Sequence, residues 1–473
     1  MAFINGDWHK ISQGRSCDLL HPDTEVQSGR VLSSPRSLVE AAVSATQTAA
    51  ENWSRSDTQT RLKVLRSLID GITARHTLFA KTISTEIGAP IEFCHQQQVA
   101  AAIQHLEATV TALDGACNDQ ILGLDPTHRI RYEAVGTAAL ITPWNWPLNQ
   151  VVLKVGAALA AGCSMVLKPS EYATRTALLF AETMAETGLP AGVFNLLIGD
   201  GQTGADLVAH QGIDIVSFTG STRAGSQIAA AAAARMARTT LELGGKSPNL
   251  LFADCDLDLA LTQGLAHCFR NSGQSCNAAS RMLIQRPIYE RAVDRAAEIA
   301  KATALGAPDQ HGAHLGPLVN RQQYDRVQSY LRKGVASQAR LVSGGPGRAR
   351  GFDRGYYVTP TVFADVTPDN CLFQEEIFGP VLTMTPFDTE DDAIALANQT
   401  AYGLAAYVQT SDKNCADRVA RRLNAGMIQI NGTSRTQGAP FGGRKASGHG
   451  REAGIWGIRA FQDIKSISGA ARI

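Results

Sequence analysis

Short β-rich runs that alternate with helical stretches are the feature that most constrains the fold of this chain. From residue 135 onward the runs are 136–141, 164–167, 193–197 and 214–218. This alternation is typical of a parallel, doubly wound sheet with helices on both faces. A second series of the same kind starts near residue 250 and continues to about residue 430. The pattern therefore predicts two α/β units in series.

The two ends of the chain follow a different pattern. Residues 39–72 and 78–110 carry apolar side chains at helical spacing, so the first 110 residues are expected to be mostly helical after a short strand at 3–5. Residues 129–132 alternate charged and apolar side chains, as an exposed strand does, and 461–467 form a second strand-like segment. Neither an internal repeat nor a low-complexity linker is present.

Length and charge exclude several classes of protein. A chain of 473 residues is long enough for about three structural units at roughly 150 residues each. With 44 Lys and Arg against 43 Asp and Glu, the net charge of +1 argues against nucleic acid or an anionic membrane as a partner. Lys154 interrupts the longest apolar run, 151–167, which reads as a core helix and a buried strand. The opening MAFINGDWHK has no secretory pattern, so a cytoplasmic protein is expected.

The cysteines and histidines predict neither disulfides nor a metal centre. The nine cysteines are odd in number and scattered, without a CxxC pair, which fits free thiols in a reducing compartment. No HExxH pattern occurs. His311 and His314 lie in a Gly-containing segment, where a solvated loop is favoured over a pair of metal ligands.

Two glycine-containing loops compete as a phosphate-binding site. The loop GDGQTG, 199–204, has the GxGxxG spacing, but the next strand ends without an acidic residue to hold a ribose. In FTGSTRAG, Gly220 and Ser221 follow a strand and open a helix whose free N–H groups suit a pyrophosphate. Ser221 is also an ordinary N-cap residue. The second loop is favoured. Lys168 and Glu171, at the end of another strand, are either ligand groups or a surface ion pair.

Three residues are candidates for catalysis. Cys276 lies in FRNSGQSCNAASR, where Gly273 and small polar residues leave the thiol accessible, unlike Cys163 among apolar neighbours. Glu242, in LELGGKSPN, is either a satisfied core acid or a tuned base. Asn145, in ITPWNWPLNQ, is either a turn residue or an oxyanion donor. Each structural reading is reasonable alone, but their joint occurrence points to chemistry.

The ordered set PWNWP, LKPSE, FTGSTRAG, ELGGKSPN, GQSC, EEIFGP and PFGGRKASGHGRE resembles the NAD(P)-dependent aldehyde dehydrogenase superfamily. The resemblance runs from FINGDW to the tail and so covers essentially the whole chain. It implies an α/β fold with a Rossmann-like cofactor domain, 1–115 and 135–244, and an α/β catalytic domain, 245–446. A small β oligomerisation element, 116–134 and 447–473, would make a homodimer or homotetramer.

The resemblance also implies roles for single residues. Cys276 matches the nucleophile, Glu242 the general base and Asn145 the oxyanion donor, while Lys154 and Glu452 match a proton exit route. The residues that match cofactor contacts are Thr142, Trp144, Lys168, Ser170, Glu171, Gly220, Ser221, Gly225, Leu243, Glu376 and Phe378. The cofactor is expected to be NAD, with NADP possible, because Glu171 would meet the adenosine ribose.

The substrate stays open between an aromatic aldehyde and a semialdehyde that carries a carboxylate. The pocket residues that the resemblance implies are Trp146, Leu153, Arg270, Ser275, Asn277, Arg435 and Phe441. Arg270 resembles an arginine that succinate-semialdehyde dehydrogenases use on the substrate carboxylate, but its companion position holds Leu153. Arg435 is a substitute or a solvated loop residue. A CoA-acylating relative and a non-enzymatic descendant of the fold are the alternatives. The water-activating Glu242 argues against the first, and the intact Cys276, Glu242 and Asn145 against the second.

Overall fold

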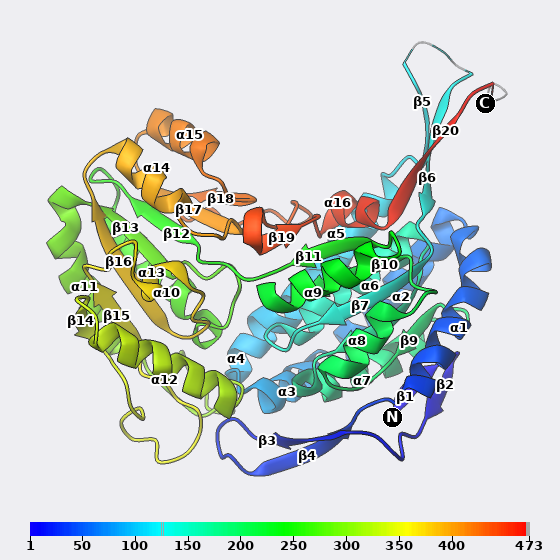
Figure 1. Ribbon diagram of the computed structural model, residues 1–473, viewed down its shortest axis with the longest axis horizontal. Coiled ribbons are helices and arrows are strands. Elements are labelled where there is room, and N and C mark those ends of the chain that lie inside the picture. The colour runs from blue at the N-terminus through cyan, green and yellow to red at the C-terminus, as the bar shows by residue number, and fades with distance from the viewer. Residues whose placement is uncertain (124, 126, 470–473) are drawn as a thin grey trace.

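Two large sheets organise the computed structural model, which describes residues 1–123, 125 and 127–469. One sheet lies in each half of Figure 1, and a thin arm projects beside the first. The first sheet has eight strands, in the spatial order β19, β11, β10, β7, β8, β9, β1 and β2. Their bounds are β19 Gly448–His449, β11 Arg238–Glu242, β10 Ile215–Thr219, β7 Thr137–Thr142, β8 Ser164–Pro169, β9 Phe194–Leu196, β1 Ala2–Ile4 and β2 Asp7–His9.

The order in which the chain adds strands to the first sheet reverses between β7 and β10. The chain passes from β7 to β8 and β9 on one side, and then returns to place β10 and β11 on the other, all five strands running parallel. Ligands of open α/β sheets bind at the carboxyl ends of strands beside such a switch point. Here Thr142 and Thr219 end the two strands that flank it.

Helices cover both faces of the first sheet. Their bounds are α1 Arg36–Ser54, α2 Thr58–Ala74, α3 His76–Ile87, α4 Ile91–Phe93, α5 Ala100–Asp114, α6 Pro147–Ala161, α7 Thr174–Ala185, α8 Gly201–Ala209 and α9 Thr222–Ala233. A π-helical turn, η1 Cys94–Val99, leads into α5. Helix α6 is buried along its whole length, begins with Pro147 and ends at Gly162 in the left-handed conformation. It is therefore the core helix expected from the apolar run.

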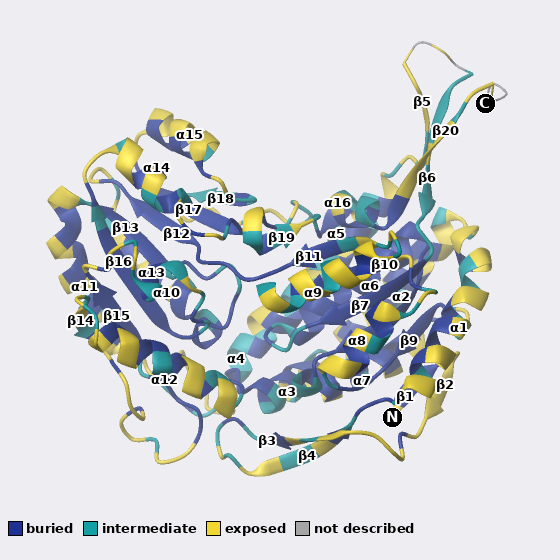
Figure 2. Cartoon of the chain, viewed as in Figure 1, coloured by how far each residue is buried: buried dark blue, intermediate teal, exposed yellow. Residues whose placement is uncertain are grey.

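The second sheet has seven strands, in the order β14, β15, β16, β13, β12, β17 and β18. Their bounds are β14 Arg340–Ser343, β15 Thr361–Ala364, β16 Val381–Phe387, β13 Arg281–Gln285, β12 Pro248–Leu251, β17 Ala405–Gln409 and β18 Met427–Ile430. The helices of this half are α10 Leu257–Phe269, α11 Tyr289–Ala302, α12 Arg321–Val335, α13 Cys371–Gln374, α14 Glu390–Asn398 and α15 Lys413–Arg422. Figure 2 shows that the central strands of both sheets are buried while the outer faces of the helices are exposed.

Strands from distant parts of the chain form the projecting arm. β6 Arg129–Ala134 pairs antiparallel with β20 Gln462–Ile467 on one side and with β5 Asp119–Ile121 on the other. The exposed strand and the C-terminal strand expected from the sequence are thus paired. Helix α16 Gly454–Ala460 precedes β20 and packs on α5 and α6. Residues 124, 126 and 470–473 of the predicted oligomerisation element lie outside the described residues.

The fold class expected from the sequence is confirmed, but the expectation for the first 110 residues missed β2 and a further pair of strands. β3 Ser16–Leu20 and β4 Gln27–Leu32 form an antiparallel hairpin before the first helix. Most of their side chains are polar or exposed, so no apolar alternation marks them. Within the part of the chain that the structure describes, no helix has the length and apolar character needed to cross a membrane.

Candidate active site

Cys276 lies in a tight loop between the η3 turn, Arg270–Gly273, and β13. Asn271, Ser272 and Gly273 take left-handed backbone angles in succession, with φ of 53°, 56° and 75°. A Cβ on Gly273 would lie 2.0 Å from the carbonyl oxygen of Gly379, so only glycine fits there. The loop is therefore held in a costly conformation, of the kind found at functional sites.

Asn145 joins this loop to the first sheet. Its side-chain amide donates to the Gln274 carbonyl at 2.9 Å. The main-chain carbonyl of Asn145 accepts from the side-chain amides of Asn271 at 2.9 Å and Gln98 at 3.0 Å. The structure thus brings Asn145 to the nucleophile loop. Gln98, on the π-helical turn, was not singled out from the sequence, although the polar run HQQQ inside an apolar helix is a signal of a functional segment.

Glu242 is a buried carboxylate at the end of β11. It is 2% exposed, and neither carboxylate oxygen has a hydrogen-bond partner among the described residues. Burial raises the pKa of Glu242 well above its usual value, and the nearby Glu452 raises it further, whereas Lys154 and Arg451 act in the opposite direction. A Cβ on Gly442 would lie 2.6 Å from Glu242 Oε1, so any larger residue at this position would collide with the carboxylate. These are the surroundings of a base that has to take up and release a proton.

Lys154 and Glu452 form a buried ion pair beside Glu242. The Lys154 Nζ lies 2.5 Å from Glu452 Oε1, and it also donates to Ser217 Oγ at 3.1 Å. The second Glu452 oxygen has no partner among the described residues. Lys154, Glu452 and Glu242 thus form one buried cluster of titratable side chains.

The Cys276 thiol is in an environment that disfavours the thiolate. Burial raises its pKa, and the carboxylates of Glu376 and Glu242 add to the effect. The backbone N–H groups of Asn277 and Cys276 act in the opposite direction and lower the pKa. The reactive form of this thiol therefore depends on how its main-chain neighbours are held.

The switch point of the first sheet carries unused polar groups. The buried hydroxyls of Thr142 and Thr219 have no hydrogen-bond partner among the described residues. Ser221 Oγ caps α9 by accepting from Ala224 N–H at 3.3 Å. A Cβ on Gly225 would lie 2.5 Å from Leu243 Cδ2, so this glycine allows the helix to approach Leu243.

In the competing loop, 199–204, a carboxylate of the protein already caps the start of the helix that follows. Asp200 caps α8 by accepting from the N–H groups of Gln202 and Thr203. Arg15 Nε then pairs with Asp200 at 2.7 Å. A negatively charged cap at this helix start disfavours a pyrophosphate, which supports the preference for the 220–225 loop.

Other residues expected at the cofactor lie at or just after the ends of β7 and β8, or come from the second half of the chain. Lys168 is 4% exposed at the end of β8, and burial lowers its pKa. Ser170 Oγ donates to Glu171 Oε2 at 3.2 Å. From the second half of the chain, Phe378, at φ 63°, packs edge-on against Trp144 with ring centroids 5.6 Å apart. The two halves of the chain therefore meet at these aromatic rings.

Glu376 faces the loop that follows β11. Its Oε1 accepts from Gly245 N–H at 3.0 Å, and burial raises its pKa to about 7. A Cβ on Gly244 would lie 2.4 Å from Glu376 Oε2. The Gly-Gly pair after Glu242 therefore lets a second carboxylate approach the nucleophile region.

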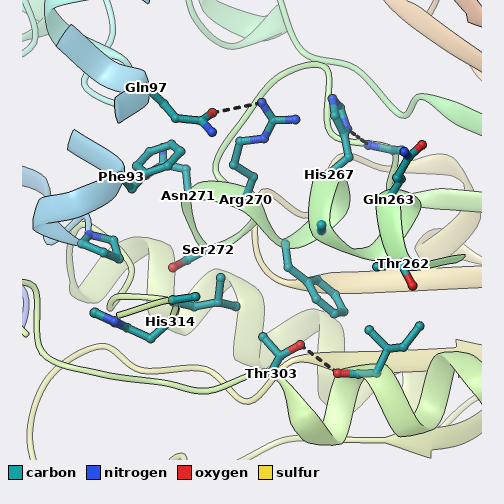
Figure 3. Close-up of a pocket in the computed structure, with 18 of the residues that line it drawn as sticks. Phe93, Gln97, Thr262, Gln263, His267, Arg270, Asn271, Ser272, Thr303 and His314 are labelled. Atoms are coloured by element: carbon teal, nitrogen blue, oxygen red, sulfur yellow. Dashed lines mark hydrogen bonds between the residues drawn. The ribbon is translucent and has the colours of Figure 1, made fainter. Parts of the chain in front are cut away.

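A cavity of about 880 Å³, lined by both polar and apolar side chains, lies beside the nucleophile loop. Arg270, Gln97 and His267 line it, and Arg270 Nη1 donates to Gln97 Oε1 at 3.3 Å (Figure 3). Tyr407 also lines it. Gln97, His267 and Tyr407 were missed from the sequence, because nothing in their own segments marks them.

Among the other expected pocket residues, four form two contacting pairs and Leu153 lies apart from them. Trp146 Nε1 donates to Ser275 Oγ at 3.0 Å, so these two meet next to Cys276. The Arg435 guanidinium lies over the Phe441 ring, 5.3 Å from its centroid. Leu153 is buried on α6 at 5% exposure.

Comparison with known proteins places these features in a family context. The model of the aldehyde dehydrogenase family matches residues 8–467. A 3-succinoylsemialdehyde-pyridine dehydrogenase from a Pseudomonas species is 41% identical over 99% of this chain and 98% of its own. An aldehyde dehydrogenase structure from Bartonella henselae superposes with a TM-score of 0.97 at 44% identity, covering 99% of this chain and 98% of that one. A mutant of aldehyde dehydrogenase C from Pseudomonas syringae, in complex with NAD+ and octanal, has a TM-score of 0.97 at 41% identity, covering 100% and 97%.

Proposed function

The chain belongs to the aldehyde dehydrogenase family, and from that premise we propose that it oxidises an aldehyde to the carboxylic acid with NAD+, using Cys276 as the nucleophile. The observation that carries this proposal is the convergence of Cys276, Glu242 and Asn145 from distant segments onto one loop.

The chemistry assigns one task to each of these residues. The Cys276 sulfur attacks the aldehyde carbon, forms a C–S bond and leaves a tetrahedral thiohemiacetal with a negatively charged oxygen. The Asn145 side-chain amide and the Cys276 backbone N–H donate to that oxygen, and losing one such donor typically costs about 10²–10³ in rate. When the C–H bond breaks with its electron pair, the carbonyl reforms as a thioester on Cys276.

Glu242 completes the reaction. It takes a proton from a water molecule, whose oxygen attacks the thioester carbon, and the C–S bond breaks with its electron pair to release the acid and the Cys276 thiolate. A raised pKa suits this role, because the carboxylate has to accept a proton near neutral pH. We further propose that the Lys154–Glu452 pair passes that proton on.

The residues at the switch point fit NAD. The unpaired hydroxyls of Thr142 and Thr219 and the start of α9, whose cap Ser221 is uncharged, suit a pyrophosphate. Lys168 and Glu171 suit the adenosine ribose. NAD+ supplies the hydride acceptor. The NAD+ in the Pseudomonas syringae complex supports the same choice here.

For the substrate we propose an aldehyde whose far end is polar, with a semialdehyde favoured over a simple aromatic aldehyde. Arg270 and Arg435 are both partly buried, and burial lowers the pKa of each guanidinium. Neither forms an ion pair with a described carboxylate, which leaves both able to meet a substrate anion. The 41% identical relative also carries a semialdehyde in its name.

The test is a panel of aldehydes followed by NADH absorbance, with matched chain lengths that end in a carboxylate, a pyridyl ring or a methyl group. The product is identified with and without CoA. Free acid as the product supports the proposal. Acyl-CoA formation that depends on CoA, or no oxidation of any aldehyde, refutes it.

We also propose the domain division 1–115 with 135–244, 245–446, and 116–134 with 447–473, and a homodimer or homotetramer assembled through the arm. The outer strands β5 and β20 have free edges, and Ile464 on β20 is 65% exposed. The nine free cysteines fit a cytoplasmic location. Light scattering on the intact chain, compared with a variant carrying Ile464→Lys, measures the assembly.

A further inference from the structure

Two buried side chains contact the nucleophile loop on the C-terminal side of Cys276. The Tyr407 hydroxyl, on β17, donates to the Asn277 carbonyl at 2.8 Å. His267 Nδ1, on α10, accepts from the Ala279 N–H at 3.2 Å. The Tyr407 hydroxyl and His267 Nε2 lie 3.3 Å apart, and the ring centroids are separated by 4.8 Å. The two residues therefore hold consecutive peptide groups of the same loop, 277–278 and 278–279.

The hydrogen bonds assign the tautomer of His267. Because Nδ1 accepts a backbone N–H, the ring proton resides on Nε2 and is donated to the Tyr407 oxygen, which leaves the phenolic O–H for Asn277. Burial, together with Arg270, lowers the pKa of His267 to about 3, so the ring is neutral throughout the working range. The hydrogen bonds therefore run in one direction, from His267 through the Tyr407 hydroxyl to the Asn277 carbonyl.

This series of hydrogen bonds ends at Asn277, whose N–H favours the thiolate form of Cys276. Around the sulfur, burial and the carboxylates of Glu376, from the segment before β16, and Glu242, from β11, favour the neutral thiol. The phenol of Tyr407 is the titratable group that faces the thiol from β17. The N–H groups of Asn277 and Cys276 oppose these effects. The carbonyl that Tyr407 holds belongs to the 277–278 peptide and the Asn277 N–H to the 276–277 peptide, so the two are coupled through the φ and ψ angles of Asn277. A small change in these angles would move the N–H away from the sulfur.

We propose that Tyr407, oriented by His267, is a positioning residue that fixes the Asn277 main chain so that its N–H faces the Cys276 sulfur. This inference rests on the proposed function only in taking Cys276 as the nucleophile. His267 and Tyr407 act by holding the main chain of the loop, without contact to the reacting atoms. Both side chains also line the 880 Å³ cavity, so a substrate contact is the competing explanation of any loss of activity.

The test measures the thiol without substrate. The intact protein is treated with iodoacetamide over a range of pH values, and modification of the peptide that contains Cys276 is followed by mass spectrometry. Tyr407→Phe should move the midpoint of the rate profile upward by about half to one pH unit, since one hydrogen bond to the thiolate is weakened. The limiting rate at high pH should stay within about twofold. For a short aldehyde, kcat/KM at pH 7 should fall about 3- to 10-fold and recover at higher pH.

Tyr289→Phe is the matched control. Tyr289 is also a buried tyrosine, 4% exposed, and its hydroxyl donates to Asp365 at 2.9 Å in a different core cluster. It should leave the alkylation midpoint unchanged. His267→Asn keeps an acceptor for the Ala279 N–H but loses the contact with Tyr407, so its shift should lie between those of the parent and His267→Ala.

Three results would overturn the proposal: an unchanged midpoint in Tyr407→Phe, an equal shift in Tyr289→Phe, or a uniform loss of alkylation at every pH. If Tyr407→Phe does not fold, the comparison of His267→Asn with His267→Ala decides, and equal midpoints refute it. A failure of the proposed function is seen separately, as aldehyde oxidation that survives Cys276→Ala.

Discussion

Replacing Lys154 with Met should make the stability of the protein strongly dependent on pH. Lys154 and Glu452 are paired at 2.5 Å with side chains that are 0% and 6% exposed. Removing the lysine leaves a buried carboxylate without its cation, which typically costs about 3–5 kcal/mol when the carboxylate is ionised. It also removes a group that lowers the pKa of Glu242, so that pKa rises further.

The sign of the pH dependence follows from proton linkage. A carboxyl whose pKa is higher in the folded than in the unfolded state binds more protons when folded. Its contribution to stability is present at low pH and is lost as pH rises through the folded pKa, by up to about 1.4 kcal/mol per pH unit for each carboxyl. Lys154→Met should therefore lose more stability at pH 8.5 than at pH 6, compared with the parent at the same pH.

The assay is urea unfolding at pH 6, 7 and 8.5, with Lys246→Met as the matched control. Lys246 is also buried, but its Nζ has no partner among the described residues, and burial lowers its pKa to about 7. Its removal should be neutral or stabilising, with the larger gain at pH 6, where the parent buries a charged amine. The two variants should differ in the sign of the change, because one removes the partner of a buried carboxylate and the other removes an unpaired buried amine. A Lys154→Met penalty that is equal at pH 6 and 8.5, or a similar loss of stability in Lys246→Met, would refute the reasoning.

Three further predictions concern the reaction. Cys276→Ala should abolish aldehyde oxidation while NAD binding, measured by calorimetry, survives; substantial residual turnover would exclude Cys276 as the nucleophile. Glu242→Gln should keep a rapid burst of NADH in stopped-flow measurements but lose the steady-state rate, because only thioester hydrolysis needs the base. Equal loss of burst and turnover would instead place Glu242 in thiol activation. Glu171→Gln should raise kcat/KM with NADP relative to NAD, since a like-charge pair at about 4 Å costs about 1–4 kcal/mol between water and an effective dielectric near 20. An unchanged cofactor ratio would show that Glu171 does not set the preference.

The parallel strands of the first sheet could be predicted because each is short, apolar and followed by a helix. The runs 136–141, 164–167, 193–197 and 214–218 all coincide with β7, β8, β9 and β10 within two residues at either end. The β3–β4 hairpin could not be predicted in the same way, because distant contacts stabilise it. Glu25, in its turn, pairs with Arg321 at 2.6 Å and accepts from the Gly355 N–H at 3.0 Å. Such contacts leave no periodic pattern in the local sequence.

A residue of the candidate site could be predicted where its neighbours in the sequence are unusual for a residue of its type. Cys276 is set among small polar residues, Asn145 among tryptophans and prolines, and Glu242 between leucines. Tyr407 and His267 have no such mark, since a tyrosine on an apolar strand and a histidine on an apolar helix are ordinary core residues. Only the tertiary structure places them on the nucleophile loop.

The electrostatics of the site depends on tertiary structure more than on composition. A net charge of +1 gives no hint that the carboxylates of Glu242 and Glu376 both face the Cys276 sulfur. Because the pKa of Glu376 is raised to about 7, that carboxyl is partly protonated near neutral pH and opposes the thiolate less there than at pH 9. As pH rises, Glu376 ionises before the thiol loses its proton, because burial raises the pKa of Cys276 above its usual value. The charge that Glu376 gains therefore opposes the ionisation of the thiol, and the two groups titrate as a coupled pair.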